Sequence, residues 1–382
     1  MIAPVTVEGV AAPAFEPVRD EFERLLRERR GWSGSLAAYV DGVPVVDLWG
    51  GPDWSADTVV FLYSATKGVS GVCIALLVER GLLELDAPVA RYWPEFGAAG
   101  KEAISVRQLL SHQAGLVTVD GGATLAELCD HDAIAGKLAA QRPFWEPGTR
   151  HGYHAVTLGP LMEELVRRVA GLPLPAFLAQ EVTRRLGIDG DLFLGFPESE
   201  EPRLAPIFPA PPLPQDILEP AMQQMSVAPG AAAGVVPSDL GIDDLPRNRA
   251  IRAAGVASAS GVGNARGLAR LYAACITEVD GHRLLSPETV ATVSETQVSG
   301  LDAIIAGETR FGIVFQTPWP GRIDMAGAGS FGHDGYGGAL GYASPRHGLA
   351  LGFTTNQIPE CRGCDPATAS LTSAILRCAG RG

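Results

Sequence analysis

Ser64 and Lys67, the ends of the tetrad SATK at 64–67, could together do covalent chemistry. Residues three apart lie on one face of a helix, so the Lys67 amine can reach the Ser64 oxygen. A serine hydroxyl becomes a good nucleophile when a nearby base removes its proton. A lysine can be that base where its surroundings lower its pKa towards neutrality. The tetrad alone is a weak signal, so its sequence context must support the interpretation.

Tyr153 lies in a second segment of chemical interest, the run GTRHGY at 148–153 that precedes an expected helix. A tyrosine near a cationic lysine ionises more easily and can carry a proton. The alternative is a core tyrosine whose hydroxyl is satisfied by a hydrogen bond.

The run FGHDGYGG at 331–338 is rich in glycine and precedes an expected strand. Such a segment lets the backbone approach a ligand closely, and one of its N–H groups with that of Ser64 would form an oxyanion hole. A plain hairpin turn explains the same residues. The run lacks the lysine of a P-loop, and no G-x-G-x-x-G register fits it.

Other motifs are weak or missing. His112, in the run LLSHQAGL at 109–116, is more often structural than catalytic when it stands alone. The sequence has no H-E-x-x-H and no other cluster at metal-ligand spacing, so we expect no metal. No serine stands in G-x-S-x-G, which argues against an α/β-hydrolase. Cys361 and Cys364 form a C-x-x-C without a second pair at zinc spacing.

The elements that must position these residues follow from periodicity. An amphipathic helix is expected at 14–30, and two β-rich runs flank Asp41-Gly42, a strong hairpin signal. A largely buried helix follows at 66–80, with Gly81 at its end. Further helices are expected at the positions 105–112, 155–170, 173–186, 263–277 and 366–378, and strands at 311–316, 338–344 and 349–356. Strands at both ends and helices between them predict an α/β domain built from both termini with a helical insertion.

The ordered set SATK (64–67), VRQLLSHQAGL (106–116), GTRHGYHAVTLG (148–159) and FGHDGYGGALGYASP (331–345) resembles the serine β-lactamase/penicillin-binding-protein superfamily. The similarity runs from about residue 15 to 378. Its closest branch is that of the class C β-lactamase-like carboxylesterases, known as family VIII.

The resemblance implies an α+β fold, with an antiparallel sheet flanked by helices and a separate all-helical domain. We expect the sheet domain at 1–60 and 290–382, and the helical domain at 61–289. The proline-rich stretch at 197–250 is expected to be a loop or lid.

The resemblance also implies roles for single residues. Ser64 would be the acylated nucleophile, with Lys67 and Tyr153 sharing the acid–base work. The backbone N–H groups of Ser64 and Tyr336 would form the oxyanion hole. The substrate-binding segment would be the tripeptide His333-Asp334-Gly335, which stands where the family has Lys-Thr-Gly.

Two departures from the lactamase pattern bear on the substrate. The motif Tyr-x-Asn reads Tyr153-His154-Ala155, and His333 replaces the lysine of Lys-Thr-Gly. A histidine is mostly neutral at pH 7, so both changes favour neutral esters over substrates with a carboxylate. We therefore predict a serine carboxylesterase without a cofactor. The alternatives are an acyltransferase of secondary metabolism, then a weak β-lactamase or D-amino-acid peptidase, and last a non-catalytic binding protein.

Composition limits the partners. The net charge of −13 argues against nucleic acid, since phosphate binding needs a basic face. No apolar stretch reaches the length of a membrane span, and the first 22 residues show no secretory pattern. We expect a cytoplasmic enzyme with six free thiols that acts on a small ester, and a homodimer is compatible with the sequence.

Overall fold

The computed structural model describes residues 6–210, 240–305, 307–319, 323, 325–361 and 363–381. The strands are β1 (Val7–Ala11), β2 (Gly34–Val40), β3 (Val43–Gly50), β4 (Val60–Phe61), β5 (Leu192–Phe193), β6 (Val262–Gly263), β7 (Val298–Leu301), β8 (Glu308–Phe311), β9 (Phe331–Asp334), β10 (Leu340–Ser344) and β11 (Leu349–Thr355). The α-helices are α1 (Glu16–Glu28), α2 (Ala65–Glu79), α3 (Val106–Leu110), α4 (Leu125–Leu128), α5 (His131–Ala140), α6 (Leu158–Ala170), α7 (Leu174–Leu178), α8 (Arg184–Leu186), α10 (Arg249–Ala254), α11 (Ala265–Ile276), α12 (Pro287–Ser294) and α13 (Ala367–Cys378).

The hairpin predicted at Asp41-Gly42 joins β2 to β3. Val40 pairs with Val43, and the two turn residues have φ of 51° and 81°. A two-residue turn of type I′ requires positive φ at both positions, which aspartate and glycine tolerate. The hairpin prediction is confirmed.

The main sheet has six antiparallel strands in the order β1-β3-β2-β11-β10-β9. Its centre joins the two ends of the chain, because β2 pairs with β11 from Gly34↔Thr355 to Val40↔Leu349. The prediction of a sheet built from both termini is therefore confirmed. Beyond β11 the sheet continues through β10 to β9, which forms the first half of the glycine-rich run at 331–338.

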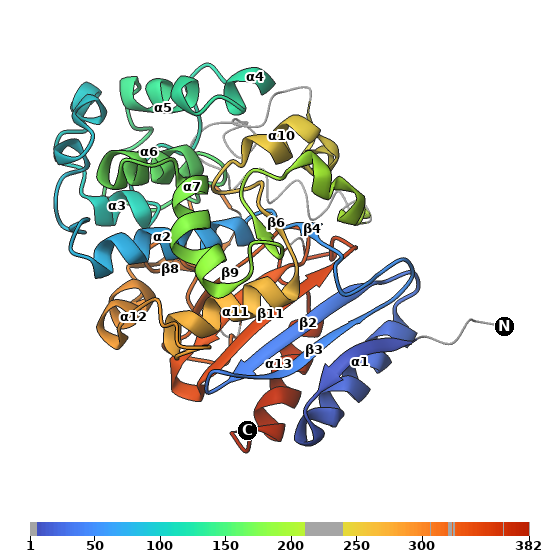
Figure 1. Cartoon of the computed structure of the whole chain (residues 1–382). Coiled ribbons are helices and arrows are strands. Elements are labelled where there is room, and N and C mark those ends of the chain that lie inside the picture. Colours follow the sequence, from blue (N-terminus) through green and yellow to red (C-terminus); the bar gives the residue numbers. More distant parts are fainter. Residues whose placement is uncertain are drawn as a thin grey trace.

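Helices cover both faces of this sheet (Figure 1). On one face α1 and α13 bury Phe22 and Leu371 against the side chains of Leu36 and Leu351. On the other face α11 crosses the strands so closely that a Cβ on Gly352 would lie 2.1 Å from the carbonyl oxygen of Ala265. Helices α3 to α7 and α10 gather beyond α2, away from α1 and α13.

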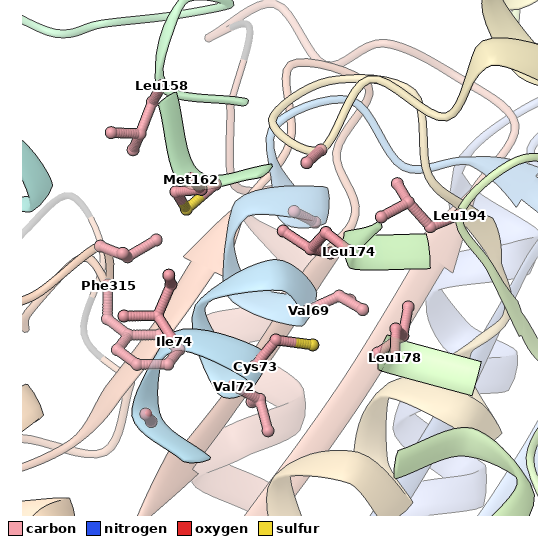
Figure 2. Close-up of a cluster of buried hydrophobic side chains, with 14 of the residues drawn as sticks. Val69, Val72, Cys73, Ile74, Leu158, Met162, Leu174, Leu178, Leu194 and Phe315 are labelled. Carbon is pink, nitrogen blue, oxygen red and sulfur yellow. The ribbon is translucent and has the colours of Figure 1, made fainter. Parts of the chain in front are cut away.

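Helix α2 is buried along almost its whole length, from Ala65 to Leu77. A helix that is apolar on all sides belongs to the interior of a protein, as the sequence predicted for 66–80. Figure 2 shows Val69, Val72 and Ile74 among side chains from α6, α7 and the 311–316 segment. Packing on every side fixes the position of the first turn of α2, which carries Ser64 and Lys67.

The strand expected at 311–316 is wrong. Only Phe311 belongs to β8, and the chain then bends, with Val314 at φ 69°. Its apolar residues are buried as the strand pattern suggests, but they serve as core anchors in a turn whose Val314 N–H donates to the Leu110 carbonyl. Periodicity cannot separate these two uses of a short apolar run.

The predicted loop or lid at 197–250 lies in part, at 211–239, outside the described residues. Within the described part of that stretch, Glu198–Arg203 forms a 3-10 turn, and Ile242–Arg247 forms another before α10. The boundaries expected between a sheet domain and a helical domain stay a prediction. Among the described residues, no helix has both the length and the apolarity needed to cross a bilayer.

Candidate active site

Ser64 stands immediately before the first turn of α2, where Tyr63 precedes it with φ at 48°. A bulky residue in the left-handed region is strained, and such strain persists only where the surrounding structure holds it. Here the 257–261 segment does so. Leu62 N–H donates to the Gly261 carbonyl at 2.8 Å, and Gly261 N–H donates to Thr66 Oγ1 at 2.9 Å.

Lys67 is fully buried, and its Nζ lies 3.3 Å from Ser64 Oγ. Two backbone carbonyls surround the same nitrogen, that of Ala155 at 2.5 Å and that of Ser258 at 2.9 Å. A neutral amine has two N–H donors and one lone pair. In the neutral form the two carbonyls would take both N–H groups, and the lone pair would face the Ser64 hydroxyl.

The electrostatics of the site agree with a neutral amine. Burial holds the pKa of Lys67 well below its ordinary value, and only the charge of Asp334 opposes this. Lys67 is also the third residue of α2, at the positive end of the helix dipole, where a cation is disfavoured. A neutral lysine beside a serine hydroxyl is a suitable general base.

Tyr153 lies in the loop before α6, and its ring meets the same two residues. Its side chain interacts with that of Ser64, and Lys67 Nζ lies 4.7 Å from its ring centroid. Phe311 stacks on the ring at 5.6 Å and 6°. Burial is the main cause that raises the pKa of Tyr153, and the charges of Asp334 and Asp302 raise it further. The phenol therefore stays protonated and can act as a donor.

His333 ends up beside Tyr153, with ring centroids 6.1 Å apart, but it is no cation. It is fully buried, and Nδ1 lies 2.7 Å from the Asp334 carbonyl. Burial, with the nearby Lys67, lowers the pKa of His333 to about 3. The Asp334 carboxylate is engaged elsewhere, since it accepts from Gln316 Nε2 at 2.9 Å and from Cys364 N–H at 2.7 Å.

The glycine-rich run touches the start of α2. A Cβ on Gly335 would lie 2.2 Å from the Leu62 carbonyl oxygen and 3.4 Å from Ala65 N. Only glycine allows this approach. The next residue, Tyr336, packs its ring against that of Tyr63 at 5.4 Å. The backbone around Tyr336 therefore borders Ser64, whose N–H has no acceptor among the described residues.

His112 and His154 support the Tyr153 loop. His112 Nδ1 accepts from His154 N–H at 3.0 Å, and His154 Nε2 accepts from Leu116 N–H at 3.0 Å. A ring nitrogen that accepts carries no proton, so both histidines are neutral. Burial lowers the pKa of both, that of His154 to about 4.

Several groups that contact the site residues could not be predicted from the sequence. The carbonyls of Ala155 and Ser258 could not be found, because every residue type has a carbonyl. Asp302, which binds the backbone of Tyr153, and Gln316, which binds Asp334, stand outside the recognisable motifs.

Two other sets of reactive side chains make no hydrogen bond with Ser64, Lys67 or Tyr153 among the described residues. The cysteines are free thiols, among which Cys361 is exposed. His131, Asp132 and Glu164 hold possible metal-ligand atoms within 4.8 Å of one another. However, Glu164 already pairs with Arg167 at 2.8 Å and with Arg168 at 2.7 Å, which makes this group an ion-pair network rather than a cation site.

Comparison of the sequence with known proteins shows its family. The sequence model of the Beta-lactamase family matches residues 18–368. Esterase/beta-lactamase LipL of Mycobacterium tuberculosis (strain ATCC 25618 / H37Rv) is 36% identical over 378 residues, which cover 92% of this chain and 83% of LipL.

Solved structures agree over the whole fold. EstA from Arthrobacter nitroguajacolicus Rue61a is 40% identical, with a TM-score of 0.87 over 97% of this chain and 98% of EstA. A family VIII carboxylesterase is 35% identical, with a TM-score of 0.89 over 98% of this chain and 100% of its own. The resemblance found in the motifs is confirmed: the chain belongs to the Beta-lactamase family.

Proposed function

We propose that this protein is a serine carboxylesterase that works through an acyl-Ser64 intermediate. The observation that carries the proposal is the contact of Ser64 Oγ with two groups of opposite role. Lys67 Nζ, whose pKa burial holds well below its ordinary value, lies 3.3 Å away, and the Tyr153 side chain interacts with the same serine. The relatives named as esterases support the same activity.

In acylation, Lys67 takes the Ser64 proton as Oγ attacks the ester carbonyl. The negative charge that develops on the carbonyl oxygen would be bound by the N–H groups of Ser64 and Tyr336. When the C–O bond breaks, Tyr153 gives its proton to the departing alkoxide and is reprotonated by Lys67. Charge and protons balance without any metal or cofactor.

In deacylation, a water molecule replaces the alcohol. The neutral Lys67 and Tyr153 pair removes a proton from this water as it attacks the acyl carbonyl. Collapse of the second tetrahedral intermediate returns the proton to Ser64 Oγ and releases the acid. The same groups therefore serve both half-reactions, as microscopic reversibility requires.

Neutral esters fit this site better than substrates that carry a carboxylate. His333 stands where the resemblance puts a lysine, and it is buried and uncharged. The Asp334 carboxylate accepts hydrogen bonds from Gln316 and from the backbone of Cys364. We assign His333, Asp334 and Gly335 to shaping the substrate groove beside Ser64 rather than to binding an anion.

The test is hydrolysis of p-nitrophenyl acetate, butyrate and octanoate beside nitrocefin, with the wild type and Ser64→Ala. We expect ester turnover that Ser64→Ala abolishes while the fold remains, with little nitrocefin cleavage. Retained ester turnover in Ser64→Ala would overturn the assignment. Nitrocefin cleavage as fast as ester cleavage would favour the β-lactamase or D-amino-acid peptidase alternative.

The acyltransferase alternative shares the acyl-enzyme and differs only in the acceptor. A stoichiometric burst of p-nitrophenol without steady turnover would mean that water is the wrong acceptor. Adding alcohols or amines then shows whether the acyl group passes to them. Failure of serine-directed probes to label the protein would instead favour a non-catalytic binding protein.

The wider setting also stays a prediction. We propose a small ester as the natural substrate and the cytoplasm as the place of action, with a homodimer as a compatible state. Cell fractionation and sedimentation of the purified protein test the last two.

A further inference from the structure

The backbone around Tyr153 is held by groups from distant parts of the chain. Three successive N–H groups are bound from outside their own loop. Gly152 N–H donates to the His112 carbonyl at 3.0 Å, and His154 N–H donates to His112 Nδ1 at 3.0 Å. Between them, Tyr153 N–H donates to both carboxylate oxygens of Asp302, each at 3.1 Å.

Asp302 lies at the end of β7, in the hairpin to β8, and is 7% exposed. Its Oδ1 accepts from the N–H groups of Ile304 at 2.8 Å and Ile305 at 2.9 Å. Its Oδ2 accepts from the Thr309 hydroxyl at 2.8 Å. The carboxylate is therefore held in place by its own hairpin, independently of its hydrogen bonds to Tyr153.

The same hairpin grips the Tyr153 loop at two further points. Ala303 N–H donates to the His151 carbonyl at 3.0 Å, and His151 Nε2 lies 3.0 Å from Thr309 Oγ1. Phe311, the last residue of β8, stacks on the Tyr153 ring. One hairpin thus holds both the backbone and the ring of Tyr153.

We propose that Asp302 is a positioning residue that fixes the Tyr153 hydroxyl over Ser64 by binding the Tyr153 backbone. The inference rests on the proposed esterase function. Asp302 touches neither Ser64 nor Lys67 by any recorded contact, so it acts through Tyr153. An asparagine at 302 would present an NH2 group to one of several N–H donors, which breaks the grip without changing the volume.

The test compares two esters whose leaving groups differ in their need for a proton. A p-nitrophenolate departs without a proton, whereas an ethoxide needs one, so displacement of Tyr153 should matter mainly for the ethyl ester. We measure kcat/KM for ethyl butyrate and p-nitrophenyl butyrate, per active site titrated with a serine-directed probe. The variants are Asp302→Asn, Tyr153→Phe, their double mutant and Thr309→Val.

We expect Asp302→Asn to lower kcat/KM for ethyl butyrate roughly 10- to 100-fold, and for p-nitrophenyl butyrate less than about threefold. In the Tyr153→Phe background the same change should have an effect below about twofold, because residues that act through one group are not additive. If Asp302→Asn fails to fold, Thr309→Val, which removes one of the donors to the carboxylate, should show the same pattern at smaller size.

Glu164→Gln is the matched control, since Glu164 is a buried carboxylate with its own partners on α6, away from Tyr153. It should lower the melting temperature and leave both esters within about twofold, as expected of a purely structural change. Equal losses on both esters, or an undiminished loss in the Tyr153→Phe background, would overturn the role of Asp302. If Tyr153→Phe itself leaves ethyl butyrate turnover intact, the assignment of Tyr153 in the proposed function fails instead.

Discussion

Two buried lysines of this chain each donate to backbone carbonyls, but the third partner of the side-chain nitrogen differs: it is a carbonyl for Lys101 and a serine hydroxyl for Lys67. Lys101 Nζ donates to the carbonyls of Ala98 at 2.8 Å, Ala139 at 2.8 Å and Gln141 at 2.5 Å. Lys67 Nζ has two carbonyls and the Ser64 hydroxyl. Three carbonyls can be satisfied only by the three protons of an ammonium, whereas two carbonyls and a hydroxyl suit a neutral amine.

The helices strengthen this contrast. The Ala139 and Gln141 carbonyls lie at the C-terminal end of α5, where the helix dipole stabilises a cation. Lys67 lies in the first turn of α2, where the dipole opposes one. Burial lowers the pKa of both lysines, but well below the ordinary value only for Lys67. Burial is the main cause in both cases and has the larger effect on Lys67; the set of acceptors and the helix end favour the same difference between the two lysines.

The largest effect should come from Lys67→Met. Removal of the base should lower kcat/KM for p-nitrophenyl butyrate by about 10²- to 10⁴-fold. The protein should still fold, although two carbonyls lose their donor at a cost of about 2 kcal/mol in the free energy of unfolding. Steady-state kinetics and thermal unfolding of the same sample check both statements. Activity within tenfold of the wild type would mean that another group is the base.

Lys101→Met should lower the stability of the protein and leave its activity unchanged. It leaves three carbonyls without their donor, with a cost of about 3 kcal/mol in the free energy of unfolding. The kcat/KM per active site should stay within about twofold, because no atom of Lys101 meets the site. Chemical denaturation and active-site titration measure the two quantities. A large loss of activity per titrated site would show that the two lysines are coupled.

The pH dependence of kcat/KM should report the protonation of Lys67 and not that of Lys101. Below the pKa of Lys67 the amine is protonated and cannot accept the Ser64 proton, so kcat/KM should fall as the pH drops through that pKa. The buried histidines cannot produce this limb at neutral pH, since burial lowers the pKa of His333 to about 3 and that of His154 to about 4. A profile recorded with p-nitrophenyl butyrate should show the same midpoint in the wild type and in Lys101→Met. A midpoint that moves with Lys101 would contradict the comparison.

The smallest effect should come from Asp334→Asn. The Asp334 charge raises the pKa of Lys67, so its removal should lower that pKa and move the acidic limb of kcat/KM to lower pH. We expect a shift below about one pH unit, because burial dominates the pKa of Lys67. The same pH profiles measure it. A shift to higher pH would mean that Asp334 acts on the site by another route.

The sequence predicted what depends on near neighbours. The spacing of Ser64 and Lys67 predicted their contact, and Asp41-Gly42 predicted the β2–β3 hairpin, because both are set within a few residues. The helix expected from residue 105 also begins there, since the Ser105 side chain caps α3 by accepting from Gln108 N–H. The fold class followed from the ordered motifs and is confirmed by the family match.

The rest depends on contacts between distant segments. Asp302 meets the Tyr153 backbone across 149 residues, and no local pattern marks such a pair. The carbonyls that bind Lys67 Nζ come from residues 88 and 191 positions away. The run at 311–316 looked like a strand, because its alternation reports burial and not the φ of Val314. The roles of the site residues stay predictions until the variants are measured.

The pairing of β2 with β11 has a consequence for the synthesis of the protein. Ser64 and Lys67 leave the ribosome early, but the strand that completes the centre of the sheet begins only at Leu349. Contacts so far apart in sequence form late and slowly, and unpaired strand edges invite association with other chains. Nascent chains shorter than about 355 residues should therefore hold the nucleophile without an assembled site. Such chains leave the β11 side of β2 unpaired, and hydrolysis would begin only after β11 has left the ribosome.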